Sequence, residues 1–436
     1  MKKELRNKKG ITLIALVITI IVLLILAGVS ISMISSQDGI LKKTTSAKEM
    51  NKKAEYEEAV KLALQAAMVN ENAEVDYDNI DKYLTGAQVD KDAKIIKYNE
   101  NNYQVKKDGT IKEVAWYVTT NNDNKYVVTN GKGKEILLGA IINYDPYTGV
   151  NNEELTVTPY ENKLGGTNIA YRIANNQEQK LIWKVIGTDD DGNILIMSTK
   201  NATDSTGTIQ KLRIGGEDFE TTKMAVKYAV EEVNRICGIY GHGKGAKSAR
   251  SVQVEDIDRL AEYDKTKYEQ DSIYEYGHNV TYTKTSNGID YIWGETTGST
   301  GESKFEYLGE NGNWNLLINE GDSITVKATY YSYRMSEMST WGVNLKGKDV
   351  YELITADTSK DNNPYWIASS YVGAGSRYAN YGMRYVCNSY VNGYSLANSN
   401  GNCYSDSYGL RPVVSLNSDV EFTEKTENDV IVYDIN

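Results

Sequence analysis

Tyrosine and asparagine are abundant in the last quarter of this chain, where they could form a surface for binding. The 436 residues include 34 Tyr but only 3 Phe, and residues 365–416 contain neither Lys nor Glu. Tyrosine offers a large ring with a polar tip, and asparagine adds adaptable hydrogen bonds, as in antibody paratopes. Asparagine also shapes turns, so only part of the set is expected to bind. The predicted ligand contacts are Tyr371, Arg377, Tyr378, Asn380, Tyr381, Asn388, Tyr390, Asn392, Tyr394, Asn398, Asn400, Asn402 and Tyr404.

Residues typical of catalysis are scarce. The two histidines, His242 and His278, lie in no spacing typical of a Ser/His/Asp triad or of a metal site. We therefore predict no enzyme, no catalytic residue, no metal and no cofactor, although a hydrolase built on paired carboxylates stays open. The net charge of −11 argues against nucleic acid as a partner.

Two short motifs come close to known sites. Asp189, Asp190 and Asp191 lack the alternate spacing of a helix-loop-helix calcium site, and the apolar runs on both sides favour a hairpin turn. Residues 238–244 have the G-x-x-x-x-G-K spacing of a phosphate loop. Gly245 stands where that loop has Ser or Thr, and the run follows a predicted helix, so a glycine-rich turn is favoured.

The three cysteines do not form a disulfide framework. Cys237, Cys387 and Cys403 are too few, and spacing alone does not establish geometry. A bridge between Cys387 and Cys403 stays open, with Cys237 left as a free thiol.

Several elements that would position these residues can be read from periodicity. Residues 219–239 predict an amphipathic helix, and a second short helix begins near Ser251. Residues 181–186 and 194–197 predict a hairpin around the Asp189 turn. Residues 103–105 and 111–114 predict another hairpin, with Asp-Gly at its turn.

The N-terminus predicts a membrane segment and a stalk. Residues 11–34 carry no charge, and about 20 such residues span a bilayer. The basic residues before Gly10 place the N-terminus in the cytoplasm and the bulk of the chain outside the cell. Residues 40–68 continue with helical periodicity. A plain anchor and a secretory signal remain alternatives.

The junction Lys9-Gly10-Ile11-Thr12-Leu13-Ile14 resembles the leader of type IV prepilins. The resemblance implies cleavage between Gly10 and Ile11 by a prepilin peptidase, methylation of the new N-terminus, and assembly with pilin subunits. Ala15 stands where that family usually has Glu, which puts efficient assembly in doubt.

A second resemblance concerns the C-terminal part. Residues 366–369 (WIAS) and 409–416 (GLRPVVSL) look like the end of C-type-lectin-like domains, in the branch that includes formylglycine-generating-enzyme-like modules. The calcium-lectin triplets and the metal-binding Cys pair of those families are missing, so neither activity is implied. The Tyr/Asn excess is also similar to targets of diversity-generating retroelements.

Together these patterns predict an α+β fold with a long N-terminal transmembrane and stalk helix. The predicted parts are a leader (1–10), the membrane and stalk helix (11–70), a small β-rich head (71–150), a C-type-lectin-like domain (151–425) and a tail (426–436). The predicted function is surface display of a domain that binds a protein or glycan ligand, in adhesion or recognition. The alternative is a structural minor pilin or pseudopilin of a filament or a type II-like secretion system.

Overall fold

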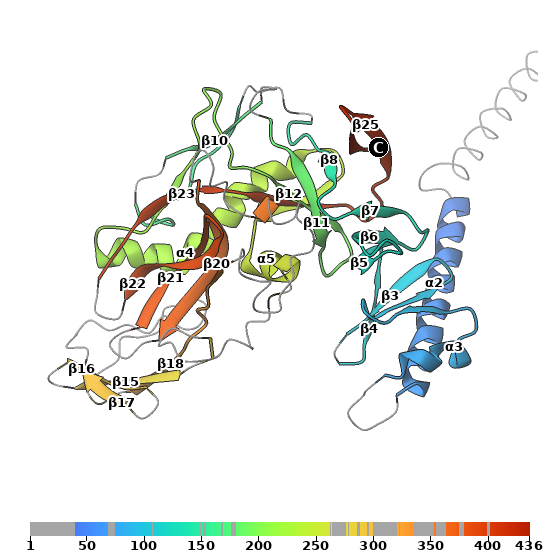
Figure 1. The fold of residues 1–436 in the computed structure, drawn as a ribbon, viewed down its shortest axis with the longest axis horizontal. Helices are drawn as coiled ribbons and strands as arrows, with labels where there is room; N and C mark the ends of the chain where they lie inside the picture. The colour runs from blue at the N-terminus through green and yellow to red at the C-terminus, as the bar shows by residue number, and fades with distance from the viewer. Residues whose placement is uncertain are drawn as a thin grey trace, which may run out of the picture. The chain divides into compact units, whose positions relative to one another are not determined.

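The computed structural model describes a chain that divides into two compact units, residues 1–113 and 114–436. The described residues are 40–68, 75–106, 108–148, 150, 154–166, 169–175, 180–261, 263, 276–277, 279–285, 288–293, 296–299, 321, 323–334, 353–354, 363–374, 379–398 and 402–436. Figure 1 shows the arrangement of elements within each unit.

The first unit is a helix packed on a four-stranded sheet of order β1-β2-β3-β4. Its elements are α2 (Ile40–Ala66), the 3₁₀ helix η1 (Tyr77–Asn79), α3 (Ile80–Tyr83), β1 (Gln88–Asp90), β2 (Ile95–Tyr98), β3 (Asn101–Val105) and β4 (Ile111–Val114). Val60, Ala63, Leu64 and Ala67 are buried at helical spacing and pack on the sheet's apolar side chains, while residues 46–55 of α2 are exposed. The predicted hairpin of β3 and β4 is confirmed.

The second unit contains two large sheets. The seven-stranded sheet has the order β14-β24-β12-β11-β8-β26-β25, and the six-stranded sheet has the order β13-β23-β20-β21-β22-β19. The strands of the first are β8 (Ile141–Asn143), β11 (Trp183–Thr188), β12 (Ile194–Ser198), β14 (Ala246–Ser251), β24 (Pro412–Leu416), β25 (Phe422–Glu427) and β26 (Val430–Ile435). The strands of the second are β13 (Leu212–Ile214), β19 (Tyr333–Arg334), β20 (Tyr365–Ala374), β21 (Ala379–Cys387), β22 (Tyr390–Asn398) and β23 (Asp406–Leu410).

Smaller sheets and further helical segments also belong to this unit. The strands are β5 (Trp116–Thr120), β6 (Tyr126–Asn130), β7 (Glu135–Leu137), β9 (Glu154–Val157), β10 (Tyr171–Ala174), β15 (Asn279–Thr285), β16 (Gly288–Trp293), β17 (Thr296–Ser299) and β18 (Ser323–Lys327). The helices are α4 (Phe219–Cys237), the 3₁₀ helix η2 (Gly238–His242) and α5 (Val254–Ala261). Both helices predicted from this region are confirmed, and so is the 181–197 hairpin, in which the Asp189 carboxylate accepts the backbone N–H of Asp191 and of Asn193 at 2.9 Å.

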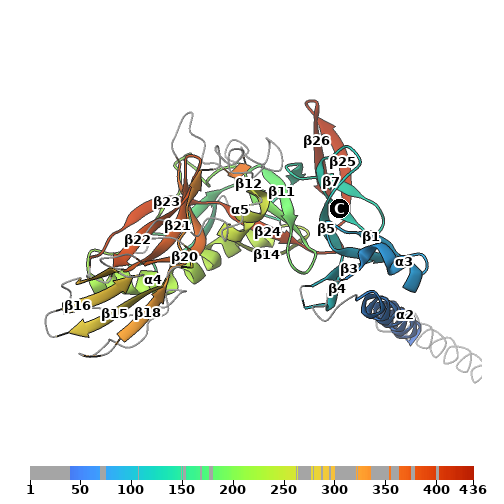
Figure 2. The same ribbon diagram turned by 60° about the horizontal axis from the view of Figure 1, so that its bottom comes forward.

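Helix α4 lies in the core between the two large sheets. Its buried side chains Ala225, Ala229 and Val233 share one apolar cluster with Ile196 of β12 and Met383 of β21. The views agree that the helix runs along the six-stranded sheet (Figure 1 and Figure 2). The Asp218 side chain caps it by accepting the backbone N–H of Thr221 at 2.9 Å. This packing gives the C-terminal strands a rigid support.

The predicted α+β class is wrong, because the structure is predominantly β-sheet. Much of the Tyr- and Asn-rich segment was expected to form short strands and turns. It forms strands of nine or ten residues instead. Aromatic and β-branched residues at alternate positions suit a pleated, half-buried surface. Residues 426–436, expected to be a tail, belong largely to β26, which pairs in parallel with β8.

The membrane-spanning part of the predicted fold also needs correction. Among the described residues, no helix is both long and apolar enough to cross a bilayer. The helix described nearest the N-terminus, α2, begins at Ile40 and carries Lys and Glu along most of its length. The apolar residues 11–34 and the predicted cleavage junction of Gly10 and Ile11 lie outside the described residues.

Candidate functional site

Strand pairing gathers most of the predicted contact residues on β20, β21 and β22. Register places Asn380 opposite Asn398 and Cys387 opposite Tyr390, at the two ends of the β21–β22 ladder. Asn402 and Tyr404 follow on the segment that leads to β23. Arg377, Tyr378 and Asn400 lie outside the described residues.

Three of the predicted contacts are buried and belong to the core. Tyr371 is 5 %, Tyr381 1 % and Asn398 4 % exposed. The Tyr371 ring packs on Tyr330 with 5.1 Å between ring centroids, and the Asn398 side chain accepts the backbone N–H of Asn402 at 3.0 Å. Side chains held in this way leave almost no area for a partner, which corrects the prediction at these three positions.

Three further asparagines of the set serve mainly the local backbone and their neighbours, namely Asn380, Asn388 and Asn392. Asn388 has a φ of 54° in the turn between β21 and β22, a conformation that asparagine tolerates. Asn392 Oδ1 accepts the hydroxyl of Tyr330 at 2.7 Å and the backbone N–H of Gly393 at 2.8 Å. Asn380 Oδ1 accepts the hydroxyl of Ser395 at 3.1 Å. The predicted contacts that stay exposed are Tyr390 (38 %), Tyr404 (44 %) and Asn402.

The strongest aromatic feature is a group of partly exposed tyrosines, Tyr385, Tyr394 and Tyr408, which we call the tyrosine patch. The three rings surround the buried Trp366 on β20, at centroid distances of 6.2, 5.7 and 4.5 Å. Tyr385 and Tyr408 are stacked at 5.0 Å, and Tyr394 meets each of them edge to face. These geometries are the favoured ones for aromatic pairs, so the patch is ordered before any partner arrives.

Hydrogen bonds hold the polar tips of this group. Tyr394 Oη donates to the carbonyl oxygen of Ser405 at 2.9 Å, and Tyr408 Oη donates to the carboxylate of Asp406 at 2.5 Å. Trp366 Nε1 donates to the carbonyl of Leu212 at 2.9 Å. Burial raises the pKa of all three patch tyrosines, so their hydroxyls stay neutral at physiological pH. The patch thus presents fixed rings and neutral hydroxyls.

Two members of the patch, Tyr385 and Tyr408, were missing from the sequence prediction. The alternation of side chains along β21 could have placed Tyr385 on the same side as Met383, the residue that pairs with Tyr394. Tyr408 was harder to foresee because it depends on the parallel pairing of β23 with β20, in which Trp366 lies opposite Leu410.

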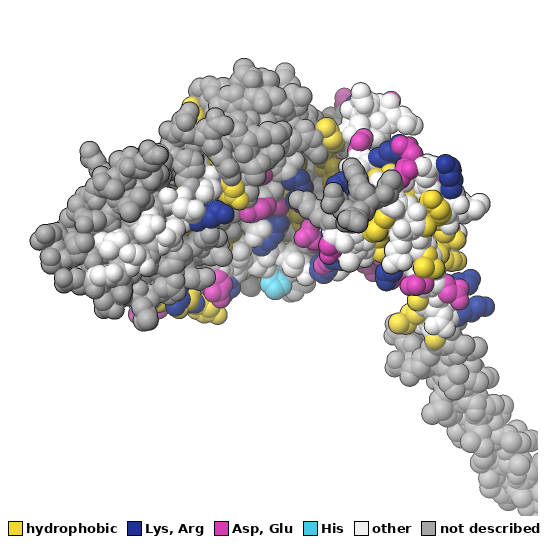
Figure 3. Space-filling model, turned by 90° about the horizontal axis from the view of Figure 1, so that it is seen from below, with side chains coloured by type: hydrophobic (Ala, Val, Ile, Leu, Met, Phe, Trp, Pro, Cys, Tyr) yellow, Lys and Arg dark blue, Asp and Glu magenta, His cyan; other side chains and the backbone are white. Residues whose placement is uncertain are grey.

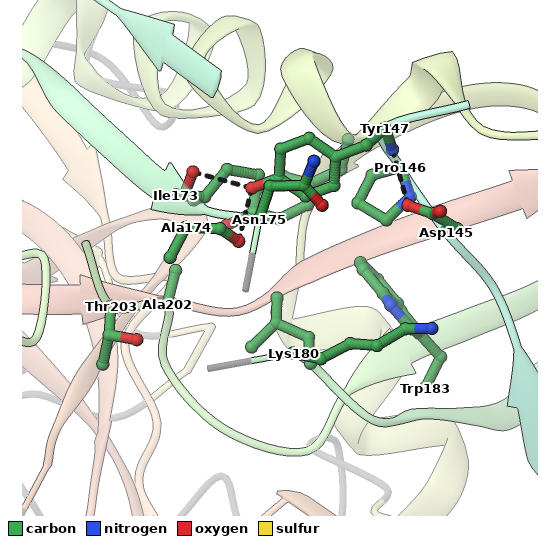
Figure 4. Close-up of a pocket in the computed structure, with 12 residues that line it drawn as sticks. Asp145, Pro146, Tyr147, Ile173, Ala174, Asn175, Lys180, Trp183, Ala202 and Thr203 are labelled. Atoms are coloured by element: carbon green, nitrogen blue, oxygen red, sulfur yellow. Dashed lines mark hydrogen bonds between the residues drawn. The ribbon is translucent and has the colours of Figure 1, made fainter. Parts of the chain in front are cut away.

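Some of the described residues also line a small cavity. A space of about 40 Å³ lies among Asp145, Pro146, Tyr147, Ile173, Ala174, Asn175, Lys180, Leu181, Trp183, Ala202, Thr203 and Tyr240. Figure 4 shows Tyr147 directed toward the carbonyls of Ile173 and Ala174, which accept its hydroxyl at 2.6 Å. A space of this size holds a few water molecules and no larger ligand.

Metal-type clusters and strongly charged patches do not mark a second site in the described part of the chain. No group of three His, Cys, Asp or Glu side chains is placed there to hold a metal, and Cys237, Cys387 and Cys403 form no disulfide with a described residue. Acidic and basic side chains are interspersed over the described part of the face in Figure 3. Comparison with known proteins adds no family: no family model matches the chain, and no curated protein or solved structure is significantly similar to it.

Proposed function

We propose that this protein displays a ligand-binding domain at the cell surface and that the tyrosine patch is its contact face. The observation that carries the proposal is the ordered cluster of three partly exposed rings around Trp366. Tyrosine has few rotatable bonds, so an anchored ring loses little entropy when a partner covers it. The exposed Tyr390 and Tyr404 extend the aromatic surface available on the same part of the chain.

Surface display rests on the leader-like junction at Gly10 and Ile11. Processing by a prepilin peptidase and methylation of Ile11 would follow from the resemblance to prepilins, with the bulk of the chain outside the cell. The C-type-lectin-like ending at residues 409–416 supports a binding domain whose ligand is a protein or a glycan. A net charge of −11 makes nucleic acid a poor candidate.

Alanine substitution in the patch tests this function. The full-length chain would be titrated against immobilised polysaccharides and cell-surface proteins, with Tyr394→Ala and Tyr408→Ala as variants. Each is expected to weaken binding by about tenfold or more, since central aromatic anchors contribute roughly 2 kcal/mol or more. Tyr83→Ala is the matched control, because Tyr83 is 53 % exposed but lies in the first unit. Unchanged binding by both patch variants, with folding verified by circular dichroism, would contradict the proposal.

A second candidate function is that of a structural subunit of a filament. It is favoured by the first unit, in which a 27-residue helix packs on an antiparallel sheet as in the pilin plan. Filaments purified from cells with and without the chain separate the two functions. A structural subunit predicts that filaments shorten or disappear without it, whereas a display protein predicts intact filaments that no longer bind.

A further inference from the structure

A groove on the second unit has a buried cation among its lining residues. Its volume is about 510 Å³, and it lies among Val226, Lys227, Val230, Gln253, Val254, Glu255, Tyr276, Thr329, Tyr331, Ala368, Ser369, Ser370 and Arg384. The lining comes from α4, the start of α5, the segment before β15, the segment between β18 and β19, the bulged middle of β20, and β21. None of the residues of the tyrosine patch lines it.

Arg384 is the unusual member of this lining. Its side chain is 2 % exposed, and its Nη1 and Nη2 donate to the carbonyls of Tyr331 and Thr329, each at 2.7 Å. The guanidinium also lies 4.0 Å from the centroid of the Tyr331 ring. Among the described residues no carboxylate forms an ion pair with it. A guanidinium carries five N–H donors, so most of its donors remain available after it has bound two carbonyls.

The buried carboxylates of this unit, Asp256 and Glu232, each bind an arginine, whereas the buried Arg411 donates to the carbonyl of Leu353 at 2.6 Å. Arg250 binds both oxygens of Asp256, at 2.6 and 2.9 Å, and the buried Glu232 binds Arg235 at 2.6 Å. A buried charge is normally paired in this way, because desolvation without a counter-charge is costly. Arg384 relies on carbonyl dipoles and a tyrosine ring, and no described carboxylate balances its positive charge.

We propose that the Arg384 groove binds a small organic carboxylate. An entering carboxylate would meet the guanidinium at the base of the groove and supply the missing counter-charge through charge-assisted hydrogen bonds. Lys227, exposed on α4, adds a second positive charge to the lining, and Glu255 is the one acid among the described lining residues. The excess of one positive charge favours a monoanion.

The remaining polar groups would orient the rest of such a ligand. Ser370, Gln253 and Thr329 contribute hydroxyl and amide groups to the lining, and the Tyr276 and Tyr331 rings meet edge to face at 6.1 Å. Two of the hydroxyls in the lining already accept a backbone N–H, Ser369 that of Val254 at 2.9 Å and Thr329 that of Val372 at 2.8 Å. The groove therefore offers a charge at its base with hydrogen-bonding groups and aromatic area around it, which is the usual composition of a small-molecule site.

Matched pairs of probes test the role of charge. Calorimetric titration of the full-length chain would compare galacturonate with galactose, and N-acetylglycine with N-acetylglycinamide. In at least one pair the acid is expected to bind about tenfold more tightly than its neutral partner, as a hydrogen-bonded charge pair implies. If neither acid binds better than its neutral partner, the proposal is overturned.

Substitutions then assign the effect to the groove. Arg384→Gln is expected to remove the preference for the acid, and Lys227→Gln to weaken acid binding about two- to fivefold, as suits an exposed charge. Lys211→Gln, at an exposed lysine outside the groove, should leave binding unchanged. Because Arg384 also holds two backbone carbonyls, the Lys227 variant decides the matter if Arg384→Gln does not fold. Equal binding by the Lys227→Gln and Lys211→Gln variants would place the carboxylate elsewhere.

Discussion

Replacing Trp366 with alanine is expected to lower the free energy of unfolding of the second unit by about 3–5 kcal/mol and to disorder the tyrosine patch. The indole is 0 % exposed and donates its Nε1–H to the carbonyl of Leu212. Its removal would leave a cavity where three tyrosine rings now converge. The carbonyl of Leu212 would also lose its partner in a buried setting.

The loss can be measured by urea denaturation followed by near-ultraviolet circular dichroism. The aromatic signal of the folded variant should fall, because the ordered packing of the tyrosines depends on the indole. Trp366→Phe is the matched variant, since it keeps a ring but cannot donate to Leu212, and it should cost about 1–2 kcal/mol less than alanine. A Trp366→Ala variant that unfolds at the same urea concentration as the parent would contradict the packing described.

Asp256→Ala is expected to cost about 3 kcal/mol, because several groups converge on one buried carboxylate. Asp256 is 3 % exposed and accepts from Arg250, from Arg259 at 3.1 Å and from the backbone N–H of Gln253 at 2.9 Å. The last bond is half of a capping box at the start of α5. Arg250 keeps 29 % of its side chain exposed and can recover some hydration, which holds the loss below that of a fully buried pair.

The neighbouring acid provides the control. Glu255 lies in the same first turn of α5 but is exposed and forms no ion pair among the described residues, so Glu255→Ala should change the unfolding free energy by less than about 0.5 kcal/mol. The unfolding of the two variants by heat or urea would be compared. The comparison separates the effect of losing a buried carboxylate from the effect of losing an exposed acid in the first turn of the helix. Equal losses in the two variants would show that the Asp256 network contributes little.

Local signals in the sequence predicted local structure well. The 103–114 and 181–197 hairpins follow from Asp-Gly turns between apolar runs, and helix α4 follows from its apolar spacing. These elements are determined by residues close together in the chain, so a pattern within a short window suffices.

Long-range pairing could not be predicted in the same way. β24 pairs with both β12 and β14, and β26 joins β8 across nearly three hundred residues. Nothing in the residues around Ile141 indicates that Val432 will lie opposite. The α+β expectation failed for this reason, because isolated strand-like runs were not recognised as parts of two large sheets.

The candidate site, too, was predicted only in part from the sequence. The composition pointed to the correct stretch of chain, but composition alone does not say which tyrosines face inward. Tyr371 and Tyr381 became core residues, whereas Tyr385 and Tyr408 joined the patch. The Arg384 groove had no sequence signal, because its lining comes from six separate stretches of the chain between residues 226 and 384.

The central claim, that the tyrosine patch is the contact face, is tested most directly by hydroxyl-radical footprinting of the full-length chain. The oxidation of each tyrosine would be compared between the free chain and the chain saturated with the polysaccharide or protein that it binds in the titrations. The proposal predicts that Tyr385, Tyr394 and Tyr408 are protected while the exposed Tyr83 and Tyr160 react as before. Unchanged oxidation of the three patch tyrosines in the bound state would contradict it.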